Sequence, residues 1–188
     1  MGIQEHLTKD AVIDAEGYRA NVGIILSRPD GRLLWARRVG RAGWQFPQGG
    51  LQPGESPEQA MYRELNEEVG LAPEQVELLG GTHDWLRYRL PVRYQRHDSE
   101  PLCIGQKQRW YLLSFTGDDA EVRLDAGAEP EFEDWRWVEY WHPLEEVIFF
   151  KRTVYRNALT ELAPLLFPQG APPAPTQKRG RRRRRKAR

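Results

Sequence analysis

Two apolar-rich runs, at residues 21–27 and 32–38, are separated by the turn-forming sequence Pro29-Asp30-Gly31. Apolar runs of this length with such a turn between them predict a β-hairpin. Four later runs, at residues 76–79, 82–90, 107–115 and 135–140, predict further strands. The pattern of apolar and polar positions therefore favours a fold that is rich in strands.

Two principal helices are predicted beside these strands. The first begins with Ser56 as N-cap, has Pro57 and Gln59 in its first turn, and stops at Gly70. Residues 43–54, just before it, are so rich in Gly and Pro that we expect a loop without regular structure. A closing helix follows from five apolar residues near helical spacing, Val154, Ala158, Leu159, Leu162 and Leu166. These elements predict an α+β fold, with a mixed β-sheet sandwiched between α-helices.

Length and composition favour one domain with tails. The chain has 188 residues, of which 39% are apolar, enough for one core. No stretch approaches the ~20 apolar residues of a membrane span, and the first residues contain no apolar run of signal-peptide length. We therefore expect a cytoplasmic protein without membrane contact. The single cysteine, Cys103, excludes an internal disulfide and a cysteine cluster, so carboxylates or histidines would have to hold any metal.

The net charge of +1 conceals an acidic body and a basic tail. Nine of the 28 Lys and Arg residues lie in residues 178–188, KRGRRRRRKAR, so the other 177 residues carry 19 basic and 27 acidic side chains. A Pro-rich stretch at residues 167–176 cannot continue a helix, so the ordered domain should end near Leu166. We expect residues 167–188 to be a disordered linker and tail. The tail is either a solvated extension or a segment that makes non-specific contacts with RNA phosphates.

Three acidic residues share one side of the first predicted helix. At about 100° per residue, Glu67 and Glu68 lie about −60° and +40° from Glu64, beside an apolar stripe that anchors the helix to the sheet. Like charges at this spacing destabilise a helix, so their clustering calls for a compensating cation. Mg²⁺ or Mn²⁺ fits, because these ions take oxygen ligands and often keep substrate phosphates in their shell. Such an acidic pattern alone is most often a solvated helix face, so its context decides.

That context resembles the Nudix hydrolase family. Residues 49–71 read GGLQPGESPEQAMYRELNEEVGL and satisfy every specified position of the Nudix box. The resemblance implies the Nudix fold and metal-dependent hydrolysis of a nucleoside diphosphate linked to another moiety. The matching residues are Gly49, Glu55, Arg63, Glu64, Leu65, Glu67, Glu68, Gly70 and Leu71.

Other segments resemble the bacterial RNA pyrophosphohydrolase branch of this family. That resemblance implies removal of pyrophosphate from 5′-triphosphorylated RNA to leave a 5′-monophosphate, which promotes mRNA decay. It spans roughly residues 17–166 and leaves out an N-terminal extension, residues 1–16, and the tail, residues 167–188. The segments include 17–23 (GYRANVG), 44–50 (WQFPQGG), 85–88 (WLRY) and 103–108 (CIGQKQ).

The resemblance also implies roles for individual residues. Glu64, Glu67 and Glu68 would hold divalent Mg²⁺ or Mn²⁺, and Glu64 or a neighbour would take the proton of the attacking water. Glu131 would complete the metal site, and Gly49 would let the backbone approach the metal. Glu55 and Arg63 would pair and fix the loop against the helix. The residues implied to contact RNA or its phosphates are Arg19, Arg38, Gly50, Ile148, Phe150 and Lys151.

Two other functions stay open at this point. The first is hydrolysis of diadenosine polyphosphates, because the Nudix box serves both kinds of substrate. The second is non-catalytic RNA binding by a module that has kept the fold, although every expected acid is present. Nothing in the sequence identifies a protein partner.

Overall fold

A computed structural model describes residues 12–40, 42–95 and 102–175, and its strands form one mixed sheet. The main path runs β3-β2-β1-β7-β5, while β4 pairs with β1, β6 with β7 and β8 with β2. Strands β1 and β7 run parallel, whereas the other pairs are antiparallel. The strands are β1 (Tyr18–Ser27), β2 (Leu33–Arg38), β3 (Trp44–Gln45), β4 (Gln48–Gly50), β5 (Val76–Gly81), β6 (Leu86–Arg89), β7 (Gly105–Phe115) and β8 (Phe132–Val138).

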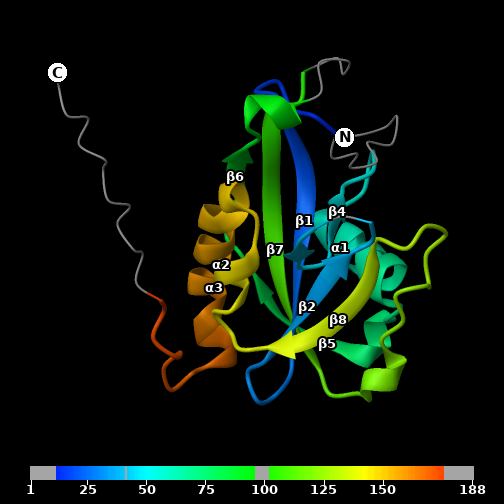
Figure 1. Cartoon of the computed structure of the whole chain (residues 1–188), viewed down its shortest axis with the longest axis vertical. Helices are drawn as coiled ribbons and strands as arrows, with labels where there is room; N and C mark the ends of the chain where they lie inside the picture. Colours follow the sequence, from blue (N-terminus) through cyan, green and yellow to red (C-terminus); the bar gives the residue numbers. More distant parts are fainter. Residues whose placement is uncertain (1–11, 41, 96–101, 176–188) are drawn as a thin grey trace.

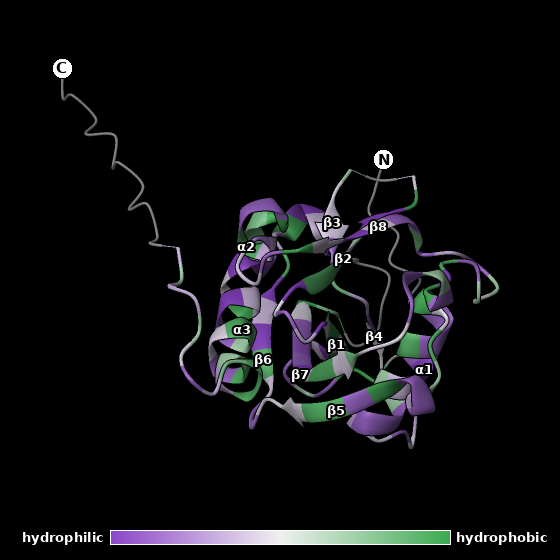
Figure 2. Ribbon diagram, turned by 90° about the horizontal axis from the view of Figure 1, so that it is seen from below, coloured by the Kyte–Doolittle hydropathy of each residue, from purple (hydrophilic) through white to green (hydrophobic). Residues whose placement is uncertain are grey.

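Helices cover both faces of this sheet, as Figure 1 shows. Helix α1 lies on one side, and α2 and α3 lie on the other; the view in Figure 2 shows the sheet between them. The predicted α+β class with a mixed sheet between helices is therefore confirmed. The helices are α1 (Pro57–Val69), α2 (Pro143–Glu146) and α3 (Arg152–Leu166), with short 3₁₀ turns η1 (Pro73–Gln75), η2 (Val92–Tyr94), η3 (Asp119–Glu121) and η4 (Phe149–Lys151).

Alternation along the central strands builds two hydrophobic clusters. In β1, Ile24 packs into the cluster that contains α1, and its neighbour Ile25 packs into the cluster that contains α3. In β7, Leu113 packs into the cluster that contains α1, and Leu112 packs into the cluster that contains α3. Successive side chains of a strand point to opposite faces, so two buried strands in the middle of the sheet hold both helices in place.

Helix α1 begins and ends where the sequence predicts. The Ser56 hydroxyl accepts from the Gln59 amide, and the Gln59 side chain accepts from the Ser56 amide, which together form a capping box. Gly70 closes the helix with φ of 71°, a left-handed conformation that favours glycine. Its apolar stripe includes Met61 and Leu65, both fully buried against the sheet.

Three predicted elements differ from the structure in detail. Residues 43–54 are not wholly irregular, because β3 and β4 form there, and β4 pairs with β1 through Asn21 and Gly50. The single strand predicted at residues 82–90 is interrupted, because the Thr82 hydroxyl accepts from the Trp110 amide and donates to the Asp84 carbonyl. Only Leu86–Arg89 then continues as β6. The strand predicted at residues 135–140 is β8, which runs from Phe132 to Val138.

Both described ends of the chain contact the domain. Near the start, Asp14 forms an ion pair with Lys107 at 2.8 Å. Beyond α3, the Trp141 indole donates to the Pro172 carbonyl at 2.7 Å, so the described part of the Pro-rich stretch lies against the fold. Residues 1–11 and the basic tail lie outside the described residues. None of the described helices is long and apolar enough to cross a membrane.

We predict that Gly70→Ala destabilises the domain more than Gly40→Ala does. Both glycines have left-handed φ values, 71° and 61°, which cost an alanine about 1–2 kcal/mol. A Cβ at Gly70 would also lie 2.9 Å from the Arg123 carbonyl oxygen, whereas nothing lies within 4 Å of one at Gly40. Urea unfolding of both variants measures the difference, and equal losses in the free energy of unfolding would contradict it.

Candidate active site

A pocket of about 360 Å³ opens beside α1 and β4. Its size suits a small ligand, but its lining contains no apolar side chain, unlike most such sites. Acids, arginines, amides and glycines make it suitable for a highly charged ligand. The lining residues are Arg19, Asn21, Gln45, Gln48, Gly49, Gly50, Gln52, Arg63, Glu64, Glu67, Glu68, Gln106 and Glu131.

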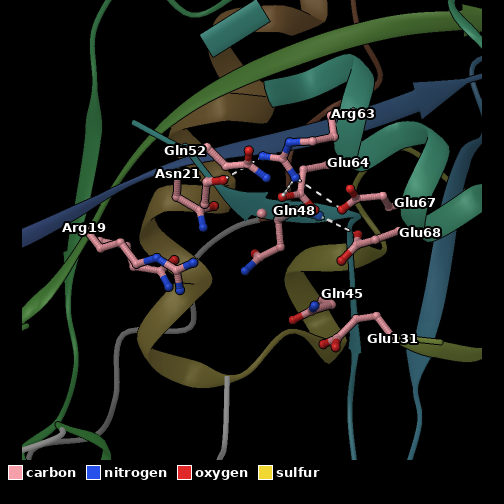
Figure 3. Close-up of a pocket in the computed structure, with 13 residues that line it drawn as sticks. Arg19, Asn21, Gln45, Gln48, Gln52, Arg63, Glu64, Glu67, Glu68 and Glu131 are labelled. Carbon is pink, nitrogen blue, oxygen red and sulfur yellow. Dashed lines mark hydrogen bonds and ion pairs between the residues drawn. The ribbon is translucent and has the colours of Figure 1, made fainter. Parts of the chain in front are cut away.

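The three predicted acids of α1 meet at this pocket (Figure 3). Glu64 and Glu68 are each only 8% exposed, whereas Glu67 lies nearer the solvent. Burial raises the pKa of Glu64, against the influence of Arg63. Burial also raises the pKa of Glu68 well above its ordinary value, and the charges of Glu64 and Glu131 raise it further. These carboxylates are therefore held close together in an environment that disfavours their charge.

Arg63 connects the acidic helix to the loop before it. Its guanidinium donates to Glu55 at 2.8 and 2.9 Å, to Glu64 at 2.7 Å and to Glu67 at 3.2 Å. It also donates to the Gly50 carbonyl at 2.9 Å. These contacts lower the pKa of Glu55 and raise that of Arg63. The geometry agrees with the expected Glu55–Arg63 pair, and Arg63 additionally holds two of the three acids.

Glu131 reaches the pocket from the segment that precedes β8. Arg38, at the end of β2, donates to its Oε1 atom at 2.7 Å. Arg38 itself does not line the pocket. Glu131 therefore lines the same pocket as the acids of α1, whereas Arg38 contacts Glu131 from outside the pocket lining.

Glu68 differs from the other lining acids in its partners. Its Oε2 atom accepts from the Gln48 backbone amide at 2.9 Å. Glu64, Glu67 and Glu131 each form an ion pair with Arg63 or Arg38, but among the described residues Glu68 forms none. Glu68 is therefore the buried acid whose charge most requires a further cation.

The two glycines of β4 leave no room for a side chain, while their approach to a metal or to phosphates stays a prediction. A Cβ at Gly49 would lie 1.7 Å from the Glu64 carboxyl carbon, and one at Gly50 would lie 2.2 Å from an Arg19 nitrogen. Any side chain at position 49 would displace Glu64. Backbone alone at these positions lets α1 and Arg19 face the same space.

Arg19 supplies positive charge at the other side of the pocket. It is 7% exposed, and its Nε atom has no hydrogen-bond partner in the part of the chain that the structure describes. In Figure 3 its guanidinium lies across the pocket from Glu67 and Glu68. A buried guanidinium nitrogen without a partner is suited to bind an anionic ligand.

The donor set fits a hard divalent cation. Within residues 12–40, 42–95 and 102–175, no three acids, histidines or cysteines already form a metal cage. The pocket nevertheless brings together four carboxylates and no sulfur. Two of these carboxylates, on Glu64 and Glu68, are buried and have raised pKa values. Oxygen donors of this kind fit Mg²⁺ or Mn²⁺, which Glu64, Glu67, Glu68 and Glu131 could hold.

Four residues expected to contact RNA lie outside the pocket lining, namely Arg38, Ile148, Phe150 and Lys151. Lys151 is 4% exposed, and its ammonium donates to the Gln48 side chain at 3.3 Å. The Phe150 ring lies 6.0 Å from the Tyr88 ring and 5.3 Å from the Tyr94 ring. Ile148, two residues before Phe150, is 37% exposed.

Sequence reasoning assigned no role to the five amides that line the pocket. They are Asn21, Gln45, Gln48, Gln52 and Gln106. These amides form no recognisable motif in the sequence. Only the position of a polar residue within a buried strand could have indicated a role. Asn21 in β1 and Gln106 in β7 are both 2% exposed, and polar residues at such positions require partners.

Comparisons with known proteins agree with this geometry. The family model described as "NUDIX domain" matches residues 17–162 of this chain. An "RNA pyrophosphohydrolase" of Thioalkalivibrio sulfidiphilus (strain HL-EbGR7) is 60% identical over 170 residues, which cover 90% of this chain and 98% of the relative. Another protein of that name, from Cellvibrio japonicus (strain Ueda107), is 63% identical over 153 residues, which cover 81% and 90% of the two chains.

Solved structures with low sequence identity share the fold. A dihydroneopterin triphosphate pyrophosphohydrolase of E. coli matches with a TM-score of 0.60 and 18% identity, covering 75% of this chain and 94% of its own. An Ap4A hydrolase binary complex of C. elegans matches with a TM-score of 0.55 and 20% identity, covering 73% and 92%. At these identities the likeness concerns the arrangement of sheet and helices.

We predict that Glu68→Gln stabilises the metal-free protein. The folded-state pKa of Glu68 lies above its ordinary value, so at neutral pH its ionised form lowers the free energy of unfolding. Glutamine removes the charge and keeps an oxygen that accepts from the Gln48 amide. In calorimetry with a chelator, the melting temperature should rise by roughly 2–4 °C for each kcal/mol recovered. Mg²⁺ should then stabilise the variant less than it stabilises the parent.

Glu77→Gln provides the matched control, because Glu77 is an exposed glutamate of β5. It should leave both melting temperatures unchanged. A metal-free Glu68→Gln protein that melts below the parent would contradict the prediction.

Proposed function

The chain belongs to the Nudix family of hydrolases, and from this premise we propose that it is an RNA pyrophosphohydrolase. It removes pyrophosphate from the 5′-triphosphate end of RNA, leaves a 5′-monophosphate and so promotes mRNA decay. Relatives of that name, 60% and 63% identical to this chain, support the assignment. We retain a cytoplasmic location as part of the proposal.

One observation carries this proposal. Buried acids on α1 face a buried arginine across a pocket that has no apolar lining. A 5′-triphosphate carries several negative charges close together, so it needs cations at both its reacting and its distal oxygens. The pocket offers Arg19 directly and carboxylates that can hold metal ions, which together match such a substrate.

The carboxylates have two roles in the proposed reaction, metal binding and proton acceptance. Glu64, Glu67, Glu68 and Glu131 would hold Mg²⁺ or Mn²⁺, which when bound neutralises phosphate oxygens and makes a coordinated water more acidic. Glu64 or a neighbouring acid accepts a proton from the attacking water, whose oxygen forms the new bond to phosphorus. The phosphoanhydride bond to the leaving group breaks, and the bridging oxygen departs with its electron pair.

Positively charged residues bind and orient the substrate. Arg19 contacts phosphate oxygens through its guanidinium, whose Nε lacks a partner among the described residues. Arg63 and Glu55 keep the acids and the Gly50 backbone in place. Phe150 and Ile148 would form an apolar slot for one of the leading nucleotides, a sequence-neutral mode of RNA contact.

We predict faster turnover of 5′-triphosphorylated RNA than of diadenosine tetraphosphate at matched concentrations. Both substrates need the acids, but the RNA carries a chain of nucleotides after its first nucleoside that can occupy the proposed nucleotide slot, whereas the dinucleotide has no such chain. Product analysis on one short defined RNA should show pyrophosphate and a 5′-monophosphate end. Faster cleavage of the dinucleotide would favour the alternative substrate, and activity retained by Glu68→Gln would contradict the role given to the acids.

We also predict that removal of residues 176–188 weakens binding to long RNA without changing turnover of short substrates. The deletion keeps the docked residues 167–175 and removes the nine basic residues of the tail. Each lost phosphate contact should reduce the slope of log K against log salt by about 0.7 for a single strand. A length-matched tail with Ser in place of Lys and Arg is the control, and an unchanged slope would show that the tail does not contact RNA.

A further inference from the structure

We propose that the side-chain amides of Gln48 and Asn21 form an uncharged phosphate-binding wall between Arg19 and the acids. We call these two residues the amide wall. We further propose that Lys151 acts as a positioning residue that orients Gln48. The inference rests on the proposed function for the identity of the natural substrate, but it concerns the phosphate chain alone.

The orientation of the Gln48 amide follows from its contact with Lys151. The Lys151 ammonium lies 3.3 Å from Gln48 Oε1. An ammonium group can only donate, so the oxygen of the amide must face it and the nitrogen must face away. Figure 3 shows that nitrogen directed into the open part of the pocket. Gln48 is 8% exposed, and among the described residues its Nε2 has no hydrogen-bond acceptor.

Asn21 presents a second nitrogen to the same space. It is 2% exposed, and its Oδ1 accepts from Gln108 Nε2 at 3.0 Å. Asn21 and Gln108 are paired in the parallel ladder of β1 and β7, so the sheet itself holds this contact in place. With its oxygen engaged, Asn21 has only its Nδ2 atom left to donate into the pocket (Figure 3).

Both amide nitrogens belong to side chains that line the pocket, and neither is among the described buried polar atoms that lack a partner. They therefore reach the open space of the pocket, where phosphate oxygens could accept from them. Arg19 lies on one side of the amide wall and the acids of α1 on the other (Figure 3). The ligand chemistry that fits this place is therefore a chain of phosphates rather than a nucleobase.

Amides suit this position better than cations would. The backbone amide of Gln48 already donates to Glu68 at 2.9 Å, so the residue adjoins the proposed metal ligands. A lysine or arginine at position 48 would form an ion pair with Glu68 and compensate its negative charge. An amide donates to phosphate and leaves the charge of the acids available for metal ions.

Binding of inorganic pyrophosphate in the presence of Mg²⁺ tests the inference on the full chain. Isothermal titration calorimetry gives the affinity without any turnover. We expect Gln48→Met to weaken binding by about tenfold to a hundredfold, the range for lost hydrogen bonds to charged groups. Lys151→Met should weaken it similarly, while Lys151→Arg, which keeps a donor, should retain it. Thermal unfolding of each variant verifies that it is folded.

A double-mutant cycle separates positioning from general structural damage. If Lys151 acts through Gln48, the variant with both replacements should bind no more weakly than Gln48→Met alone. Gln169→Met is the matched control, because Gln169 is an exposed glutamine beyond α3 that does not line the pocket, and it should bind like the parent. Asn21→Asp, which keeps the acceptor for Gln108 but replaces the donor with a negative charge, should weaken binding through both changes.

Normal pyrophosphate binding by Gln48→Met, or additive effects in the cycle, would overturn the inference. These outcomes are distinct from failure of the proposed function, which would appear as absent hydrolysis of triphosphorylated RNA by the parent. A loss of pyrophosphate affinity in Gln48→Met supports the amide wall whether or not RNA is hydrolysed.

Discussion

The constraint on which this structure depends is the burial of like charges on one helix. Glu64 and Glu68 are almost withdrawn from water, and the charge of Glu64 raises the cost of ionising Glu68. Arg63 and Arg38 compensate the neighbouring acids but leave Glu68 without an ion pair among the described residues. The protein thus retains uncompensated negative charge that a bound divalent cation would neutralise. Under the proposed function, a bound metal ion would offset the cost that this arrangement imposes on the protein alone.

The fold makes that burial possible through backbone placed where side chains would not fit. Strand β4 pairs with β1 and sets Gly49 directly against the Glu64 carboxylate. Helix α1 is fixed by its apolar stripe and by caps at both ends, so its acids cannot move apart to relieve their repulsion. Arg63 joins the same helix to the Gly50 carbonyl. The apolar stripe, the caps and the Arg63 contacts thus hold the acids and the β4 backbone next to one another.

Much of this arrangement could be predicted because its signals are local. The caps of α1, its apolar stripe and the arc of acids all follow from residues within one helix, and a long motif made their function specific. The short strands β3 and β4 could not be predicted, because Gly and Pro dominate residues 43–54 and only pairing with β2 and β1 makes them regular. The contact of Lys151 with Gln48 was equally inaccessible, since it joins residues 103 positions apart. The sequence shows the charge of Lys151 but not its burial, so it predicts a contact with RNA and gives no sign of the contact with Gln48.

The distribution of charge across the pocket also explains why uncharged residues occur in its middle. Acids that hold metal ions and cations that hold phosphates would neutralise one another if they were adjacent, and both would then bind the substrate less well. Asn21 and Gln48 lie between the two groups and bring hydrogen-bond donors without bringing charge. Their orientation depends on partners from β7 and η4, outside the family motif. In the proposed polyphosphate site, Asn21 and Gln48 thus separate Arg19 from the acids of α1, whereas Arg63 and Arg38 pair with acids directly.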